Sequence, residues 1–313
     1  MDENNAIIVA LAKCGEYDLA CLRETVDRLF QIVGFRPGRG TKILVKPNLL
    51  TAIPPDYLAC THPLVVRAIC EHLIDAGAKV RVGDSPTFGK AVDVAGKIGL
   101  TQALAHLPVT LVDLLKPRHV RLPFGVLVPI SRLALENDLI VSVPKLKAHH
   151  QMRITGAVKN VYGCVAGIRK PALHFLHGDR GCRFEQMILE IWQKLPPSIS
   201  LMDAITAMHT HGPVKGEPYP LGLLAASASP VALDCAVNTI LGLKPADAPI
   251  WNTAVSLNMP GARLEDLCFP LEAPESFNGS RFKAPDCLNC LSYRPLEFAR
   301  NLMKRRKMAS ESR

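Results

Sequence analysis

The sequence between residues 42 and 86 contains KILVKPN (Lys42–Asn48), THPLVVRAICEHLIDAG (Thr61–Gly77) and KVRVGDSP (Lys79–Pro86). The first and third segments begin with short apolar runs that are typical of buried strands. The middle segment has an apolar face at helical spacing, a hydroxyl N-cap at Thr61 and a glycine stop at Gly77. The order strand, helix, strand predicts a βαβ unit with two parallel strands.

The same alternation continues outward from this unit in both directions. Apolar runs predict further strands, and amphipathic stretches predict further helices. We therefore expect an α/β fold with a mostly parallel, helix-covered sheet built from βαβ units, in one body or in two lobes. The predicted strands are residues 6–11, 109–112, 139–143 and 198–202, and the predicted helices are residues 18–33, 184–194 and 230–241.

Length and composition are those of a folded globular chain. The 313 residues are 48% hydrophobic and 21% charged, which is too apolar for a disordered protein. We expect one large α/β domain over residues 1–275. A C-terminal extension over residues 276–313 follows it, with a CxxC remnant and a basic tail.

The positive charge is concentrated in two segments. The chain has a net charge of +9, and Asp179 is the only acidic residue between Lys145 and Arg183. The second basic segment runs from Arg294 to Arg313. A uniformly basic surface for nucleic acid would look different, so we expect a small anionic molecule as partner and no nucleic acid.

Cysteine usage and the N-terminus indicate the compartment. The ten cysteines are scattered without the density of a disulfide scaffold, which favours a reducing cytosol. The chain opens on Met1-Asp2-Glu3, acidic where a secretory signal would be basic. The sequence therefore predicts a cytoplasmic protein.

The most informative motif is VPKLKAHHQMRITGAVKNVYG, residues 143–163. It follows a predicted buried strand, and we expect its first lysines and histidines in a loop and a helix that Thr155 caps. Free N–H groups at a helix start, together with converging lysines, favour a bound carboxylate or phosphate. Neighbouring lysines also lower the pKa of one another, which makes an amine such as Lys159 a base or nucleophile. The alternative is a set of solvated surface lysines.

Other polar residues follow predicted strands and should lie on the same rim of the sheet. Lys46 and Asn48 follow one strand, Asp84 another, and Asp203 a third. Asp84 is either a proton-transfer group or an ordinary turn residue. His62 is either an acid–base or metal-ligand group, or a helix N-terminal residue with a capping role.

The end of the chain carries half of a metal-binding motif. Cys287 and Cys290 form a CxxC, but a ferredoxin pattern would need cysteines where Tyr293 and Glu297 stand. The pair is interpreted as the vestige of a cluster site. The basic stretch at residues 296–307 is amphipathic, so it is either a membrane or protein contact or a solvated terminus.

Several segments together resemble the domain of unknown function 362 family over residues of about 5–250. The segments are KPNLL (46–50), THPLVVRA (61–68), GDSP (83–86), residues 143–167, residues 201–216 and SPVALD (229–234). The resemblance implies an uncharacterised, iron–sulfur-associated protein, because many members carry a ferredoxin-like cysteine cluster near the C-terminus. This chain departs from that pattern, since it keeps only Cys287 and Cys290. The resemblance therefore implies an iron–sulfur cluster as cofactor, but the cysteine motif that would bind it is incomplete in this chain.

The leading hypothesis is a cytoplasmic enzyme that binds a small anionic metabolite in a Lys/His-rich cleft at the strand ends. The alternative is an iron–sulfur-associated redox accessory protein that uses Cys287 and Cys290, and a third hypothesis is docking on membrane or RNA through the tail. The enzyme hypothesis requires all its residues to surround one hollow. Its expected catalytic residues are Lys159, His149, Asp84 and His62, and its expected binding residues are Lys46, Asn48, Lys145, Lys147, Thr155, Gly156, Asn160 and Asp203.

Overall fold

The computed structural model describes residues 6–52, 58–86 and 89–290. In these ranges the main sheet has nine strands, ordered β10-β9-β11-β8-β3-β4-β5, with β12 beside β11 and β2 beside β12. The α/β prediction is confirmed. The strands are β2 (Ala10–Lys13), β3 (Lys42–Pro47), β4 (Lys79–Asp84), β5 (Thr110–Asp113), β8 (Leu139–Val143), β9 (Lys145–His149), β10 (Arg153–Thr155), β11 (Ser198–His209) and β12 (Glu217–Ser227).

The centre of the sheet is parallel and its margin is antiparallel. Strand β3 pairs in parallel with β4 and β8, and β11 pairs in parallel with β8 and β9. Strand β12 runs antiparallel to β11 and β2, and β10 runs antiparallel to β9. The carboxyl ends of the parallel strands therefore lie along one edge, where ligands bind in folds of this kind.

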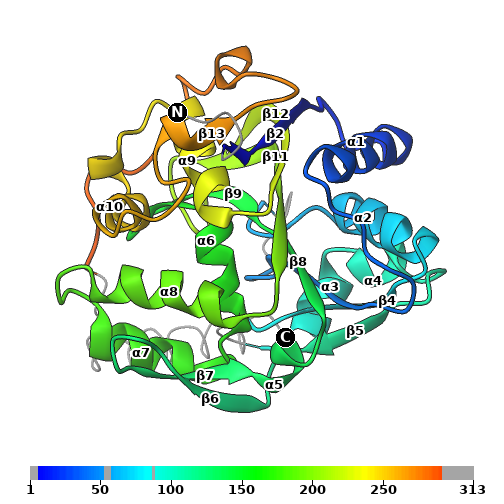
Figure 1. The fold of residues 1–313 in the computed structure, drawn as a ribbon, viewed down its shortest axis with the longest axis horizontal. Helices are drawn as coiled ribbons and strands as arrows, with labels where there is room; N and C mark the ends of the chain where they lie inside the picture. The colour runs from blue at the N-terminus through cyan, green and yellow to red at the C-terminus, as the bar shows by residue number, and fades with distance from the viewer. Residues whose placement is uncertain (1–5, 53–57, 87–88, 291–313) are drawn as a thin grey trace, which may run out of the picture.

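Helices cover both faces of the sheet (Figure 1). In β3, Ile43 and Val45 pack into the cluster of α1 and α2, whereas Leu44 packs into the cluster of α8. This alternation explains why the strand reads as a continuous apolar run. On one face lie α1 (Leu19–Ile32), α2 (Pro63–Asp75), α3 (Ala91–Lys97) and α4 (Leu100–Ala103), and on the other lie α6 (Ala157–Asn160), α8 (Arg183–Lys194), α9 (Pro230–Ile240) and α10 (Pro249–Ser256).

Smaller elements complete the body. Strands β6 (Pro117–Arg121) and β7 (Leu127–Ser131) form a hairpin, and α5 (Arg132–Leu135) follows it. A short parallel pair joins β1 (Ile7–Ile8) to β13 (Leu267–Cys268). Helix α7 (Lys170–His177) precedes α8. In the parts of the chain that the structure describes, no helix combines the length and the apolar composition that a bilayer span requires.

The expected start of helix α2 is wrong in detail. Helix α2 is capped by His62, whose ring accepts a hydrogen bond from Leu64 N, and not by Thr61. The Thr61 hydroxyl instead donates to Val143 O at 2.7 Å and accepts from Asn48 N at 2.8 Å. It therefore ties α2 to the ends of β3 and β8.

The motif at residues 143–163 is more regular than expected. The predicted loop is strand β9, which continues β8 after Pro144 and pairs with the second half of β11. Strand β11 extends to His209, beyond the predicted end at Met202. Extended backbone here brings Lys145, Lys147 and His149 onto one side of the sheet, because alternate residues of a strand share a face.

The C-terminal region stays packed on the body past residue 275. Phe277 and Phe282 are both buried in the cluster formed by β11, β12 and α9. The Tyr219 hydroxyl donates to Asn278 O at 2.6 Å. The division of the chain at residue 275 stays a prediction, and the basic tail lies outside the described residues.

Candidate functional site

The predicted site residues do not surround one hollow; most of them line two cavities. The first, of about 150 Å³, is lined by Lys46, Lys147, Lys159 and Lys170 and is called the lysine cavity. Five further residues that the sequence analysis predicted for the site also line it: Asn48, Asp84, His149, Thr155 and Asn160. The second, of about 400 Å³, is lined by Tyr17, His62 and Lys145 and is called the tyrosine–histidine cavity.

A buried ion pair forms the floor of the lysine cavity. Lys46 Nζ lies 2.8 Å from Asp84 Oδ1, and the two residues stand at the ends of the neighbouring strands β3 and β4. Leu49 N and Ser85 N also donate to the Asp84 carboxylate, each at 2.8 Å. Burial by itself raises the pKa of Asp84, but the charges of Lys46 and Lys170 and these hydrogen bonds hold it below its usual value.

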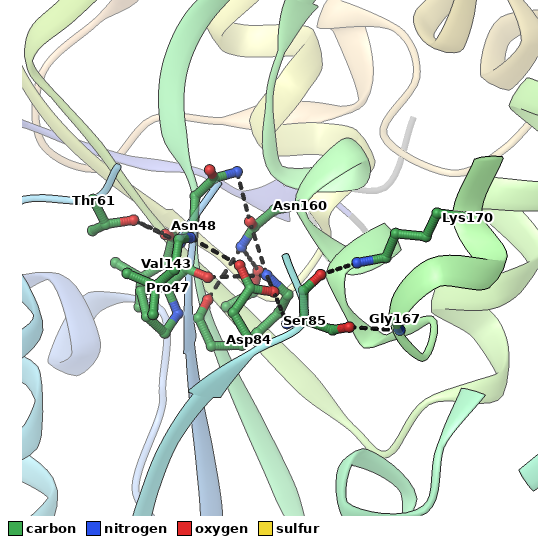
Figure 2. A network of polar contacts seen from close by, with 12 residues as sticks. Pro47, Asn48, Thr61, Asp84, Ser85, Val143, Asn160, Gly167 and Lys170 are labelled. Carbon is green, nitrogen blue, oxygen red and sulfur yellow. Dashed lines mark hydrogen bonds and ion pairs between the residues drawn. The ribbon is translucent and has the colours of Figure 1, made fainter. Parts of the chain in front are cut away.

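Asn160 joins the ends of β3 and β8 to α6 (Figure 2). Its Oδ1 accepts from Lys46 Nζ and from Asn48 Nδ2, both at 3.2 Å. Its Nδ2 donates to Lys46 O at 3.2 Å and to Ser142 Oγ at 2.9 Å. All four hydrogen bonds of the Asn160 side chain are thus made to protein groups. Asn160 therefore stabilises the cavity wall and has no hydrogen bond left for a ligand.

Lys147 and Lys170 each keep unused donors. A lysine ammonium has three N–H donors. Lys147 Nζ donates to Asn48 Oδ1 at 2.9 Å and to Ala59 O at 2.7 Å, and Lys170 Nζ donates to Ser85 O. Burial lowers the pKa of both amines to about 8. Both are charged at neutral pH, with N–H groups left for an anion.

Lys159 differs from the other lysines because its amine has no hydrogen-bond partner among the described residues. Nζ lies 4.7 Å from the centre of the Tyr162 ring and 5.0 Å from that of Phe184, and the side chain is partly exposed to the cavity. Burial, followed by the charge of Lys170, lowers the pKa of Lys159 to about 7, although Glu185 opposes the shift. A large fraction of this amine is therefore unprotonated at neutral pH.

His149 and Thr155 add neutral polar groups to the wall. His149 Nδ1 accepts from Gln151 N at 3.1 Å, which assigns the ring proton to Nε2. Burial lowers the pKa of His149 well below its usual value, so the ring is neutral. Thr155 Oγ1 is buried and has no hydrogen-bond partner in the described structure. An orphaned buried hydroxyl in a cavity wall is a position at which a ligand atom gains a hydrogen bond.

The predicted anion site at a free helix start is wrong. Helix α6 begins at Ala157 with Gly156 at its N-cap, and Thr155 ends β10. The Asp234 carboxylate of α9 accepts from Ala157 N at 2.5 Å and from Val158 N at 3.0 Å. These N–H groups already bind a carboxylate of the protein, so they are not available to a ligand.

Three other predicted residues, Lys145, Asp203 and His62, lie in the tyrosine–histidine cavity or beside it, whereas Gly156 lines neither cavity. Lys145 and Asp203 are direct neighbours on β9 and β11, and Lys145 Nζ lies 2.9 Å from Asp203 Oδ2. His62 N also donates to Asp203 Oδ2, at 3.0 Å. The ring of His62 stacks on that of Tyr17, with centroids 3.7 Å apart. His62 therefore does cap a helix, and it also lines a cavity, but not the one that holds Asp84.

The described residues do not fit an iron–sulfur cluster. Cys287 and Cys290 are exposed, as is Cys268. Across residues 6–52, 58–86 and 89–290, no three His, Cys, Asp or Glu side chains come together as a metal site would require. The CxxC segment lies on the turn between β9 and β10, where Gln151 Nε2 donates to Cys290 O at 2.6 Å.

Two residues that line the cavities were not predicted from the sequence. Tyr17 lies in an ordinary stretch before α1, and nothing local marks it. Lys170 lines the lysine cavity, although the sequence analysis counted it only as part of a basic segment. Gly163 also matters, because a methyl group there would overlap Lys46 and the Asp84 carboxylate. Gly163 is the last residue of the lysine-rich motif at residues 143–163, which was the sequence signal that could have pointed to it.

Comparisons with known proteins agree with the sequence resemblance. The family model described as domain of unknown function (DUF362) matches residues 43–239. A thylakoid-associated protein of Synechocystis, sll1697, is 35% identical over 294 residues, which cover 90% of this chain and 88% of that protein.

Two solved structures are also similar to this chain. A Thermotoga maritima protein aligns with a TM-score of 0.46 and 13% identity, over 70% of this chain and 57% of that chain. The lactate racemase apoprotein from Thermoanaerobacterium thermosaccharolyticum aligns with a TM-score of 0.43 and 14% identity, over 74% of this chain and 56% of that chain. The alignment thus spans a little over half the length of either solved chain.

Proposed function

This chain belongs to the domain of unknown function 362 family, and we propose that it is an enzyme that acts on a small anionic metabolite in the lysine cavity. The observation that carries the proposal is the charge balance of that cavity. Among the described lining residues there are four lysines and one carboxylate, and that carboxylate is already paired with Lys46. Uncompensated buried positive charge is unfavourable unless an anion can offset it.

The anion would be held by the N–H groups that the protein leaves unused. Lys147 has one such donor and Lys170 has two, while the Thr155 hydroxyl has no partner in the described structure. Hydrogen bonds from ammonium groups to carboxylate or phosphate oxygens are about twice as strong as neutral ones. These three side chains therefore serve as the anion-binding groups.

Lys159 is the group proposed to act on the bound molecule. Its pKa of about 7 provides both a free amine and an ammonium at neutral pH, and its side chain is accessible from the cavity. A lysine with a lowered pKa is able to accept a proton or to attack a carbonyl carbon as a nucleophile. His149, neutral with its proton at Nε2, supplies a hydrogen-bond donor in the same wall.

Asp84 and Lys46 receive a positioning role rather than a chemical one. A proton-transfer role for Asp84 requires a carboxylate that is free to change partners, whereas Asp84 already has three donors around it, Lys46 Nζ, Leu49 N and Ser85 N. The pair instead fixes the ends of β3 and β4 beneath the lysines.

The proposal is tested by titrating small anions into the protein by calorimetry. Phosphate, malonate and succinate serve as probes, with Lys147→Met, Lys170→Met and Lys159→Met as variants and the exposed Lys194→Met as control. We expect about tenfold weaker binding when Lys147 or Lys170 is replaced, the loss of one charge-assisted hydrogen bond. Equal affinity in all variants and the wild type would refute the site.

The compartment proposed for this enzyme is the cytoplasm. No disulfide joins cysteines within the described residues, which suits a reducing environment. Fractionation of cells that express the full chain tests this placement. Recovery with the membrane fraction, lost when residues 294–313 are deleted, would favour instead the membrane contact through the basic tail.

A further inference from the structure

We propose that the tyrosine–histidine cavity is a second binding site, which takes a small apolar molecule that carries one carboxylate. It is separate from the lysine cavity and does not depend on the function proposed there. No described residue lines both cavities. At about 400 Å³ it is also the larger of the two, in the range typical of sites for small organic molecules.

The first donor for such a ligand is Lys145. Its Nζ donates to the Tyr17 hydroxyl at 2.8 Å and to Asp203 Oδ2 at 2.9 Å. A lysine ammonium has three N–H groups, so one is left without a protein partner in the described structure. Lys145 is buried and held from two sides, which fixes the direction of the remaining N–H group.

The second donor is the ring of His62. Its Nδ1 accepts from Leu64 N at 3.3 Å, which assigns the proton to Nε2. Within the described residues this N–H group has no partner. Stacking on Tyr17, with ring centroids 3.7 Å apart and planes 14° apart, holds the imidazole in place. Burial also lowers the pKa of His62 to about 4, so the ring stays neutral and keeps this proton at Nε2.

Asp203 limits the charge that the cavity can accept. It is fully buried and accepts hydrogen bonds from Lys145, from the Tyr17 hydroxyl at 2.9 Å and from His62 N. Its negative charge compensates that of Lys145, so the site has donors but little net charge. A multiply charged anion such as phosphate belongs in the lysine cavity, whereas a single carboxylate is sufficient for two donors here.

Part of the remaining wall is apolar, although Thr61 and Thr206 also line the cavity. Leu58, Pro63 and Ile98 form this apolar part, and the Cys60 thiol is directed to Thr51 O at 3.2 Å. Burial raises the pKa of Cys60, so the thiol is neutral. A dry apolar cavity of about 150 Å³ is enough for a benzene ring. This wall therefore has room for an aromatic or branched aliphatic body next to the two donors.

The test uses benzoate as the probe, with benzamide as its neutral isostere, measured by calorimetry on the full chain. His62→Asn is the informative variant, because asparagine still caps a helix but removes the ring donor. We expect about tenfold weaker benzoate binding in this variant, as for one lost hydrogen bond to a charged group. The exposed His106→Asn is the matched control and should bind as the wild type does.

Additional measurements show in which of the two cavities benzoate binds. Lys159→Met should leave benzoate binding unchanged, and His62→Asn should leave phosphate binding unchanged. A change of the His62 Nε2–H resonance on addition of benzoate, seen in the ¹⁵N-labelled wild type, would support the site without any substitution. Absence of benzoate binding, equal binding by His62→Asn, or weakening by Lys159→Met would each overturn the proposal. Binding of benzamide as tight as that of benzoate would overturn the assignment of a carboxylate.

Discussion

Lys46 at the end of β3 and Asp84 at the end of β4 form an ion pair, 2.8 Å between Nζ and Oδ1, that is almost fully buried. The two strands are adjacent and parallel, so their carboxyl ends place these side chains next to each other. Gly163 approaches the pair so closely that no side chain fits there. This pair thus joins the sheet to the segment that follows α6.

Breaking this pair should destabilise the fold strongly. Replacing one partner leaves the other charge buried without compensation, for which about 3–5 kcal/mol of unfolding free energy is expected. Asp84→Asn and Lys46→Met should each show this loss in urea denaturation, while the double variant should lose less than their sum. Lys13→Met, which breaks the exposed pair with Glu272, should lose less than about 1 kcal/mol. Additive effects would contradict the coupling.

The same pair predicts a pH dependence. The folded-state pKa of Asp84 lies below its usual value, because Lys46 and Lys170 outweigh the effect of burial. Its contribution to stability is therefore present above the unfolded-state pKa of about 4 and is lost as pH falls through the folded-state value. The difference in unfolding free energy between wild type and Asp84→Asn should shrink as pH falls below about 4. A difference that stays constant on acidification would contradict the assignment.

Lys159 should react with amine reagents at a pH where exposed lysines do not. Its pKa of about 7 predicts half-maximal labelling by acetic anhydride near neutral pH. Exposed lysines, with an ordinary pKa of about 10.4, should still increase in reactivity through pH 9. Peptide mass spectrometry of trace-labelled protein measures the labelling of Lys159 and of the exposed lysines at each pH. An anion that binds in the lysine cavity should protect Lys159 from the reagent. Parallel pH profiles would show that its amine is not perturbed.

The close approach of Gly163 can be tested directly. Gly163→Ala forces the Lys46–Asp84 pair apart or the backbone away, and overpacking of this kind typically destabilises by about 1–3 kcal/mol. Gly15→Ala is the matched control, since nothing lies within 4 Å of the added carbon. Its stability should stay within about 0.5 kcal/mol of wild type. Equal thermal unfolding of both variants would show that the pair tolerates displacement.

Asp234 should stabilise the fold more through the hydrogen bonds that its side chain accepts than through its negative charge. Asp234→Ala leaves Ala157 N and Val158 N without partners, which costs about 1–3 kcal/mol, whereas Asp234→Asn keeps one acceptor. Burial raises the pKa of Asp234 to about 7, although the two N–H groups oppose the shift. A raised carboxyl pKa stabilises the fold at low pH, and this contribution is lost as pH rises through about 7. The stability of Asp234→Asn relative to wild type should therefore increase from pH 6 to pH 8.

The local elements could be predicted because each depends on nearby residues. The apolar run after Lys42 packs on both faces of β3, and Asp18 caps α1 by accepting from Cys21 N at 2.9 Å. The lysine-rich motif was located in sequence, but its backbone was not, since lysines have no strong preference for strand or loop. Pairing with β11 made it a strand.

The α/β class, the order of the central strands and helices, and the block in which most of the candidate residues lie could all be predicted from the amino-acid sequence. Which of those residues share a cavity could not, because it depends on how distant segments pack. Lys145 turns to Asp203, 58 residues away, and the start of α6 meets Asp234, 77 residues from Ala157. Periodicity reports the conformation of a segment, whereas the partner of a buried charge depends on the register of strands and helices that are distant in the chain. For that reason the single hollow expected from the sequence became two.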